Sequence, residues 1–319
     1  MILNSCLKSV VIGLAIVGVG LSQESTDLIA GPISGYTFVP EPGKLGITIQ
    51  HISSKSNSNF DMDGKEHALN EGNERIADPE YQKSVALLQT EFSINRNIGV
   101  YVFAPFVRKY QLNWNAEPTF LGYFDDQAGD TGLGDMVFGG WYQILRVPKY
   151  SLQLTASYIS DTGSSPDDPG IYYAMSTGTG YTATQAGLRA DLALSPKILM
   201  SLSSDIKMNN TANYTYGGGY SWEEEVANEI FLSTRLTYGL SKSLAVALET
   251  DYISRGQTSV DGEKIEDSES SGLIFTPTVG HHDASNKLDM RILVGFQVLF
   301  AGKNVLKTDG FTFGLNINF

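Results

Sequence analysis

The feature that most constrains the fold is a strict alternation of apolar and polar residues near the end of the chain. Between Leu288 and Phe300, seven apolar residues occupy alternate positions, and the positions between them include Asp289 and Arg291. Successive side chains of a strand point to opposite faces, so this period of two predicts strands with one apolar and one polar face. In a soluble sheet the apolar face is covered, and in a membrane barrel it meets lipid; the local pattern fits both.

The number of such segments and the lengths of their connections separate these two possibilities. Short turns such as Asn95-Arg96-Asn97 alternate with mostly longer connections such as residues 113–130. Short turns at one end and long loops at the other, with an even strand number, are typical of outer-membrane barrels. The sequence therefore predicts an all-β fold, a transmembrane antiparallel up-and-down β-barrel of about 12 strands. The predicted strands span residues 43–54, 83–95, 98–112, 131–146, 150–160, 179–195, 198–214, 225–240, 243–257, 270–282, 287–300 and 308–319.

The start of the chain has the order of a secretory signal. Lys8 precedes an apolar run from Val10 to Leu21, and small and polar residues follow. This run is shorter than the roughly 20 residues that a membrane-spanning helix needs. We predict cleavage after Ser22, which removes the single cysteine, Cys6. The expected organisation is a signal peptide over 1–22, a periplasmic N-terminal segment over 23–42 and the outer-membrane β-barrel over 43–319.

Composition and charge exclude several classes of protein. A chain with 42% hydrophobic and 11% aromatic residues has enough apolar surface to fold, which argues against intrinsic disorder. The mean hydropathy of −0.10 is too low for several helical membrane spans. The formal net charge of −13 disfavours nucleic-acid binding. We expect a protein exported to the bacterial outer membrane, with outer-membrane lipid and lipopolysaccharide as its surroundings.

The polar faces of the predicted strands carry charges of both signs, and these residues are candidates for the lumen. Buried charges are costly in a soluble core unless they are paired, whereas a hydrated lumen accommodates them. Opposite charges on neighbouring strands can also form cross-strand ladders. Strand 98–112 is the weakest fit, because apolar residues occupy both of its faces. The lumen-lining candidates are Asp135, Arg189, Asp191, Asp205, Lys207, Glu229, Arg235, Glu249, Asp251, Arg255, Asp289 and Arg291.

Strand number also limits the width of the bore. Side chains fill an eight-stranded barrel, whereas barrels of about sixteen to eighteen strands hold an open porin channel. A barrel of about twelve strands lies between these cases. We therefore expect a narrow lumen, partly closed by side chains, by loops or by the segment Gln23 to Pro40.

Four stretches of the chain resemble one family of outer-membrane transporters, the family associated with the MetA pathway of phenol degradation. They are SGYTFVPEPGKLGITIQ (34–50), EFSINRNIGVYVFAPFVRK (91–109), GDTGLGDMVFGGWYQIL (129–145) and TASYISDTGSS (155–165), and the GLGD step, Gly132 to Asp135, is the most recognisable. Where family members often have Pro-Thr-Gly, this chain has Asp161-Thr162-Gly163. The resemblance implies an outer-membrane channel for passive or facilitated passage of a small-molecule substrate, often hydrophobic or aromatic.

The end of the chain separately resembles a signal for membrane assembly. The barrel-assembly machinery of the outer membrane reads an alternating apolar terminus on its client proteins, and this resemblance implies that machinery as a partner. The residues of the expected assembly signal are Phe311, Phe313, Leu315, Ile317 and Phe319.

Candidate chemistry is sparse. His51 and Ser53 share one strand face, as in barrel phospholipases and lipid A deacylases, where a histidine activates a serine; the alternative is an interfacial histidine beside a Ser-rich loop. Adjacent His281 and His282 point to opposite faces, a poor geometry for joint metal binding. Asp61-Met62-Asp63-Gly64 begins like a calcium loop but lacks the later ligands.

We therefore expect no catalytic residue, no metal and no cofactor, and a channel rather than an enzyme. Two alternatives to a channel stay open at this stage. One is an outer-membrane barrel hydrolase of the phospholipase or lipid A deacylase type. The other is a barrel that does not conduct and serves as a scaffold or adhesin.

Overall fold

The structure is a computed structural model that describes residues 32–69, 80–112, 127–168, 176–216, 219–283 and 289–319. The proposed signal peptide and residues 23–31 lie outside this described part of the chain. The described residues form strands and connections. They include no helix that is long and apolar enough to cross a bilayer.

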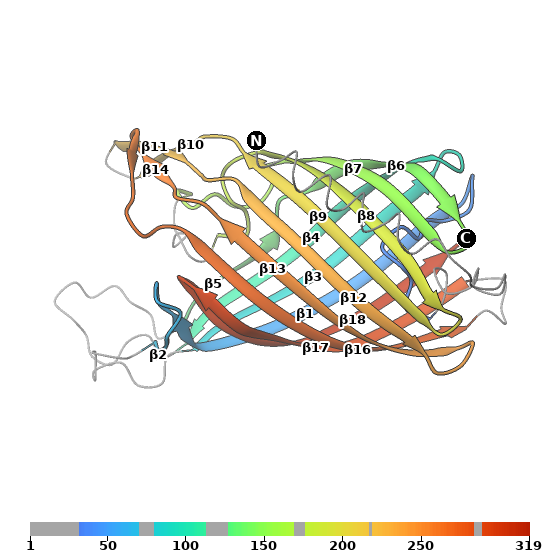
Figure 1. Cartoon of the computed structure of the whole chain (residues 1–319). Coiled ribbons are helices and arrows are strands. Elements are labelled where there is room, and N and C mark those ends of the chain that lie inside the picture. Colours follow the sequence, from blue (N-terminus) through green and yellow to red (C-terminus); the bar gives the residue numbers. More distant parts are fainter. Residues whose placement is uncertain (1–31, 70–79, 113–126, 169–175, 217–218, 284–288) are drawn as a thin grey trace, which may run out of the picture.

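Twelve long antiparallel strands form one closed barrel, which confirms the predicted fold class (Figure 1). Each strand pairs with the barrel strand before it in the chain, and the last pairs with the first, so the wall has no free edge. The strands are β1 (Leu45–Phe60), β3 (Glu80–Ser93), β4 (Ile98–Leu112), β6 (Val137–Val147), β7 (Tyr150–Ile159), β8 (Ala183–Ser195), β9 (Ile198–Asn209), β12 (Glu229–Gly239), β13 (Leu244–Arg255), β16 (Ser270–Asp283), β17 (Asp289–Lys303) and β18 (Val305–Asn318).

The two ends of the barrel differ in the length of their connections. At the short-turn end, tight turns join β3 to β4, β6 to β7, β8 to β9 and β12 to β13. At the opposite, long-loop end, further strands extend beyond the wall (Figure 1). These are β2 (Glu66–Ala68) and a four-stranded sheet of β10 (Ala212–Tyr216), β11 (Tyr220–Glu225), β14 (Ser259–Val260) and β15 (Glu263–Lys264).

Several connections predicted as loops are more regular in the structure. The expected loop over 301–307 is absent, because β17 and β18 meet at Asn304, which takes a positive φ of 47°. Asparagine tolerates this conformation better than most residues. Its side-chain amide also donates to the carbonyls of Asp267 and Glu269, at 2.6 and 2.9 Å. The expected loops over 215–224 and 258–269 contribute instead to the four-stranded sheet.

The barrel wall has an apolar exterior and a polar interior. On β12, Ile230, Leu232 and Leu236 are exposed, whereas the intervening Glu229 and Thr237 are buried. The same alternation settles the ambiguous β4, where Val100 and Phe106 are among the exposed residues and Tyr101 and Val107 are buried. Apolar exposure over the whole barrel wall is far beyond the patches that soluble monomers show. This exterior suits lipid, as transmembrane barrels require.

The register of the closing seam can be tested by cross-linking. Thr48 lies opposite Asn316, whose side-chain amide donates to the Thr48 hydroxyl at 2.8 Å, so the two side chains share a face. In a chain carrying Cys6→Ser, the pair Thr48→Cys and Asn316→Cys should therefore form a disulfide, because opposed residues meet its distance requirement. A mobility change on non-reducing gels, reversed by reductant, checks this.

The matched control for the seam combines Thr48→Cys with Leu315→Cys. Leu315 pairs with Ile49, so its side chain points to the other face of the wall, and this pair should stay reduced. Equal cross-linking of both pairs would contradict the register.

Candidate functional site

A short segment before β1 lies inside the barrel at the short-turn end; we call residues 32–42 the lumen segment. Its anchor is Asp191 on β8, which accepts hydrogen bonds from the backbone amides of Tyr36 and Thr37 at 2.9 and 2.7 Å. The Thr37 hydroxyl donates to the same carboxylate at 2.5 Å. Thr37 and Asp191 have no exposed surface. Three donors therefore compensate the burial of one carboxylate.

Glycine makes this contact possible. A Cβ atom on Gly35 would overlap the Asp191 carboxylate, so any larger residue would force the lumen segment away from β8. The sequence GYT at 35–37 therefore supplies one site of close approach and, with Tyr36 and Thr37, all three donors. The local sequence is suited to docking against a buried acid.

Aromatic residues of the lumen segment contact the charged strands around it. The Tyr36 hydroxyl donates to Glu249 on β13 at 2.8 Å, and the guanidinium of Arg235 lies over the Tyr36 ring, 4.4 Å from its centroid. Arg235 also donates to the carbonyl of Ser34. Arg291 on β17 stacks on the Phe38 ring at 4.3 Å. The lumen segment is thus held by residues of β8, β12, β13 and β17, which belong to one continuous part of the barrel wall.

Apolar residues of the lumen segment also pack against the wall. Ile33 lies in a buried cluster with Ala245 and Ala247 of β13. Val39 packs with Tyr101 of β4 and Trp141 of β6. Burial of these side chains adds a hydrophobic contribution to the polar anchor.

The interior charges form pairs across neighbouring strands. Glu229 is bound by Lys207 at 3.2 Å and by Arg255 at 2.9 Å, from the strands on either side. Arg235 lies 3.4 Å from Glu249. The register places these residues directly opposite one another. Removal of one member of such a buried pair would leave an uncompensated charge, which is strongly destabilising.

The structure also places the other lumen candidates. Asp251 accepts a hydrogen bond from Ser233, and Asp205 accepts one from Gln185 at 3.1 Å. Near the short-turn end, Asp289 binds Arg291 at 2.8 Å. Arg189 is half-buried on β8. Each of these residues belongs to a strand of the barrel wall.

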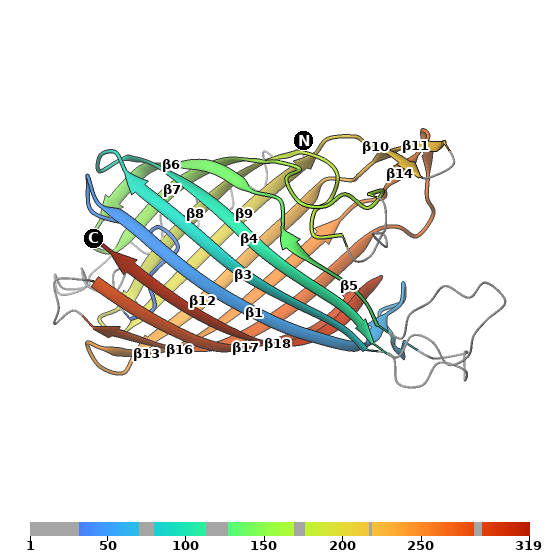
Figure 2. The ribbon, with the colours of Figure 1, turned by 180° about the vertical axis from the view of Figure 1, so that it is seen from behind.

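Asp135 differs from the other candidates because it lies at a break in the wall. β5 (Gln127–Leu133) pairs with the long-loop half of β4, β6 pairs with the other half, and residues 134–136 between them leave the ladder (Figure 2). The β4 residue at the break is Pro105, which has no amide to donate. β6 continues to pair with β7, but β5 does not.

The segment after β7 closes this break with hydrogen bonds; we call residues 160–164 and 176–179 the wall patch. Asp135 accepts from the backbone amide and hydroxyl of Thr179, both at 2.8 Å, and from the amide of Gly163 at 3.1 Å. Thr162 bridges the two sides, because its hydroxyl donates to the Gly134 carbonyl and accepts from the Met136 amide. At this position the ladder is interrupted, and the wall is held by these side chains together with backbone hydrogen bonds from the Gly134 amide to the Pro105 carbonyl, at 2.7 Å, and from the Ser160 amide to the Met136 carbonyl, at 2.9 Å.

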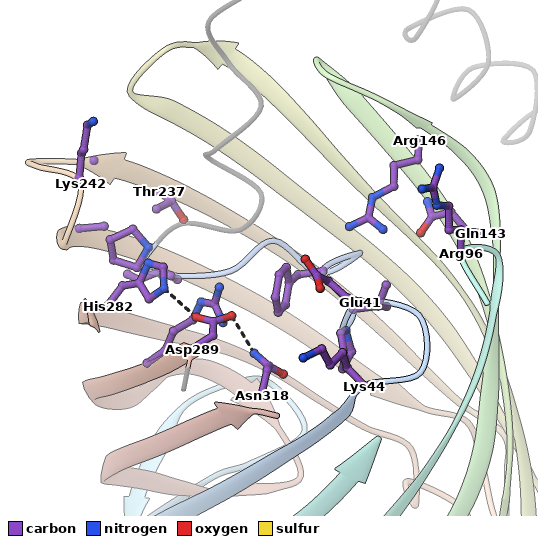
Figure 3. A pocket seen from close by; sticks show the side chains of 18 of the residues that line it. Glu41, Lys44, Arg96, Gln143, Arg146, Thr237, Lys242, His282, Asp289 and Asn318 are labelled. Atoms are coloured by element: carbon purple, nitrogen blue, oxygen red, sulfur yellow. Dashed lines mark hydrogen bonds and ion pairs between the residues drawn. The ribbon is translucent and has the colours of Figure 1, made fainter. Parts of the chain in front are cut away.

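A cavity of about 1,810 Å³ opens at the short-turn end (Figure 3). It is bounded by the lumen segment, the tight turns and the ends of β17 and β18. This volume exceeds the roughly 300–1,000 Å³ of ordinary small-molecule pockets. We call this space the vestibule.

The residues considered for other chemistry lie elsewhere. His51 and Ser53 are exposed on the outer face of β1, and no hydrogen bond or ion pair joins either side chain to the described residues. His281 is exposed and His282 points inward, where its Nε2 lies 2.7 Å from Asp289. No group of three metal-binding side chains occurs among the described residues. A polar partner for His51 and Ser53 would favour a hydrolase, and a cluster of three metal-binding side chains would favour a metal site. Neither occurs in the part of the chain that the structure describes.

The calcium-like motif forms a turn that is organised by its first residue. Asp61 accepts from the amides of Lys65 and Asp63 and lies 2.8 Å from His67, and these interactions lower the pKa of the Asp61 carboxyl, with the Lys65 amide as the main cause. The Lys307 ammonium, 2.8 Å away, lowers the pKa of Glu66 in the same way. These acids stabilise the hairpin at the long-loop end.

Sequence reasoning placed the wall residues that hold the lumen segment, Asp191, Arg235, Glu249 and Arg291, in the lumen, but it did not predict their partners in the segment. Tyr36 and Thr37 were included only within a larger segment that could narrow the bore. The expectation of a periplasmic segment over 23–42 can be compared only with its described part, residues 32–42, which lie inside the barrel. Gln143 and Gln153, on the polar faces of β6 and β7, are almost fully buried as well.

Comparisons with known proteins identify the fold. No protein-family model matches the chain, and no curated protein matches it in sequence. The structure is similar to that of the COG4313 outer membrane channel from Pseudomonas putida F1, with a TM-score of 0.67 and 15% identity over 89% of this chain and 97% of that chain. This likeness shows a shared barrel fold, and the MetA-pathway family is not confirmed.

Two further similarities are weaker. A Pseudomonas aeruginosa FadL homologue matches with a TM-score of 0.43 and 11% identity, over 94% of this chain and 98% of that chain. The TodX deltaS2S3 mutant monoaromatic hydrocarbon channel matches with a TM-score of 0.45 and 10% identity, over 92% and 93%.

The anchor of the lumen segment can be tested with Asp191→Asn. The asparagine side chain has one NH₂ group in place of a carboxylate oxygen, and this group cannot accept from the donors of Tyr36 and Thr37. At least one hydrogen bond to a charged acceptor is therefore lost, at a cost of about 3 kcal/mol. Such a loss raises the population of the undocked segment by about a hundredfold. Single-channel recording should show more frequent and longer openings than in the wild type.

Asp205→Asn is the matched control for this prediction. Asp205 is also a buried acid, on the neighbouring strand β9, but its hydrogen bond is to Gln185 rather than to the lumen segment. Increased opening in both variants would show that loss of any buried acid loosens the barrel, contrary to a specific anchor.

The interior charges should control ion preference. Glu249→Gln or Asp251→Asn removes a negative charge from the bore and leaves Arg235 in place, so the reversal potential in a salt gradient should shift toward anion selectivity. Glu263→Gln at the exposed long-loop end should have little effect, because loop charges are screened within about 8 Å at physiological salt. Equal shifts from all three variants would refute an ionic path past β13.

Proposed function

We propose that the chain is a channel of the bacterial outer membrane for passive or facilitated passage of small molecules, including apolar or aromatic ones. The observation that carries this proposal is a large vestibule within a closed barrel that has an apolar exterior. A scaffold or adhesin would not require a cavity of this size at one end. The fold shared with a solved outer-membrane channel agrees with the proposal.

The proposed orientation follows from the lengths of the connections. Short turns of outer-membrane barrels face the periplasm and long loops face the exterior. The vestibule and the lumen segment then lie at the periplasmic mouth. Outer-membrane lipid and lipopolysaccharide surround the wall, and the C-terminal strand is the element that we propose the barrel-assembly machinery recognises. Removal of a signal peptide before assembly belongs to the same proposal.

The wall patch gives apolar molecules a route that avoids the charged bore. An axial path crosses the paired charges of β9, β12 and β13 and then meets the lumen segment. The break at residues 134–136 lacks a continuous strand ladder, so it can open by the loss of a few side-chain and backbone hydrogen bonds without unpairing a whole strand. Apolar solutes would leave through this opening into the lipid, because their transfer from water to lipid is favourable. Transfer of hydrophilic solutes into lipid is unfavourable, so this route does not serve them.

Uptake of toluene tests this function. Cells that express the protein should take up toluene faster than cells without it. Asp135→Ala removes the acceptor of three hydrogen bonds in the wall patch, each contributing about 1.5–3 kcal/mol as a bond to a charged group. This variant should raise the toluene uptake rate severalfold and leave the single-channel conductance unchanged.

Asp161→Ala is the control, because Asp161 is an exposed acid within the wall patch whose side chain makes no hydrogen bond to the described residues. It should behave like the wild type. Equal toluene uptake with and without the wild-type protein would overturn the proposed function. A wild-type effect with identical rates in Asp135→Ala would instead overturn the lateral route.

A further inference from the structure

The vestibule is basic, although the chain is acidic. Six basic and two acidic side chains line it, whereas the whole chain has 22 basic and 35 acidic residues. Both acids, Glu41 and Asp289, lie near the floor formed by the lumen segment and β17 (Figure 3). The basic residues are Lys44, Arg96, Arg146, Lys197, Lys242 and Arg291. The sign of the charge at this mouth is therefore opposite to that of the protein as a whole.

Most of these cations form no salt bridge in the described structure, although Arg146 interacts electrostatically with the buried Asp191 carboxylate. Arg291 is neutralised by Asp289 at 2.8 Å. The other five make no side-chain hydrogen bond or salt bridge with the described residues, and among the lining acids only Glu41 is without a partner of this kind there. Like charges around one cavity raise its potential, and low-dielectric walls focus that potential into the opening. An anion in the vestibule would relieve this repulsion.

Two of the lining arginines belong to neighbouring elements at the rim of the barrel. The amide of Gln143 on β6 donates to the carbonyl of Asn97 at 2.7 Å, which holds the turn before β4 against the end of β6. Arg96 belongs to that turn and Arg146 follows on β6, and Figure 3 shows the Arg146 side chain reaching into the vestibule above Glu41. Guanidinium groups match the planar fork of a carboxylate, which they bind with two hydrogen bonds.

The floor of the vestibule is partly apolar. Ile33, Phe38, Val39 and Pro40 of the lumen segment all line it. A ligand that satisfies both the cations and these side chains must carry one negative charge and one apolar body. A charge on the body of the ligand would lie against these apolar side chains, at the desolvation cost of an unpaired ion. An uncharged molecule would leave the arginines unpaired.

We propose that the vestibule binds small monocarboxylates with an apolar or aromatic body, through Arg96 and Arg146 at the carboxylate and the lumen segment at the body. This inference names a substrate class for the channel, and it rests on the proposed function only where binding is taken as a step of transport. Binding itself requires the vestibule alone. It can therefore be measured on the purified protein without any transport assay.

Calorimetric titration of the folded protein in detergent tests the proposal with three probes. Benzoate has both features, benzyl alcohol lacks the charge, and acetate lacks the aromatic body. Benzoate should bind at least about tenfold more tightly than either, because it alone makes charge-assisted hydrogen bonds and buries a ring. Equal affinity for benzoate and benzyl alcohol would overturn the role of the cations. Equal affinity for benzoate and acetate would overturn the role of the apolar wall.

Variants locate the site and separate it from misfolding. Arg96→Gln and Arg146→Gln should each weaken benzoate binding, and Lys303→Gln, an exposed cation at the long-loop end, should not. Glu41→Gln removes the unpaired acid from the vestibule and should tighten benzoate binding, an effect that a folding defect cannot imitate. Unchanged affinity in both arginine variants would refute the site.

The failure of this proposal can be told apart from failure of the proposed function. Benzoate binding without toluene uptake would support the site and overturn the channel. Toluene uptake without benzoate binding would overturn the site and support the channel.

Discussion

The pairing of β1 with β18 is the constraint on which the rest of the structure depends. A closed wall satisfies the backbone groups of its strands within the ladder and leaves no edge, which is what a strand needs where lipid offers no hydrogen bonds. Closure also gives every strand an inside and an outside. Apolar residues such as Leu232 and Phe296 then occupy the exterior, and the charges can lie only inside.

The interior charges determine how the barrel is filled. Most of them pair across neighbouring strands, as Glu229 does with Lys207 and Arg255. Asp191 has no cation within salt-bridge distance among the described residues, and it takes its three donors from the lumen segment instead. A segment that would otherwise precede the barrel is thereby drawn into it. The mouth at that end is narrowed, which is why we propose the wall patch as the route for apolar solutes.

The sequence was sufficient to predict the barrel because its determinants are local. Period-two alternation assigns faces from neighbouring residues alone, and the expected faces of β12 agree with the observed exposure of Ile230, Leu232 and Leu236. Strand ends were less predictable, since the meeting of β17 and β18 at Asn304 depends on a single residue with positive φ.

The contacts of the candidate site depend on distant parts of the chain. Thr37 and Asp191 are 154 residues apart, so no periodicity relates them. The GLGD step was recognised by resemblance, but its role as a wall break became visible only with the partners of Asp135 in view, Gly163 and Thr179. The basic vestibule likewise collects Lys44, Arg96 and Arg146 from separate elements of the chain.

Hydrogen exchange at the Tyr36 and Thr37 amides is the most direct test of the central claim that the lumen segment is docked on Asp191. Both amides donate to a carboxylate with no exposed surface. In the lipid-embedded protein, they should exchange as slowly as the amides of the barrel ladder, because exchange requires the segment to leave the lumen. Exchange as fast as in an exposed loop would contradict the docked segment and the narrowed mouth that depends on it.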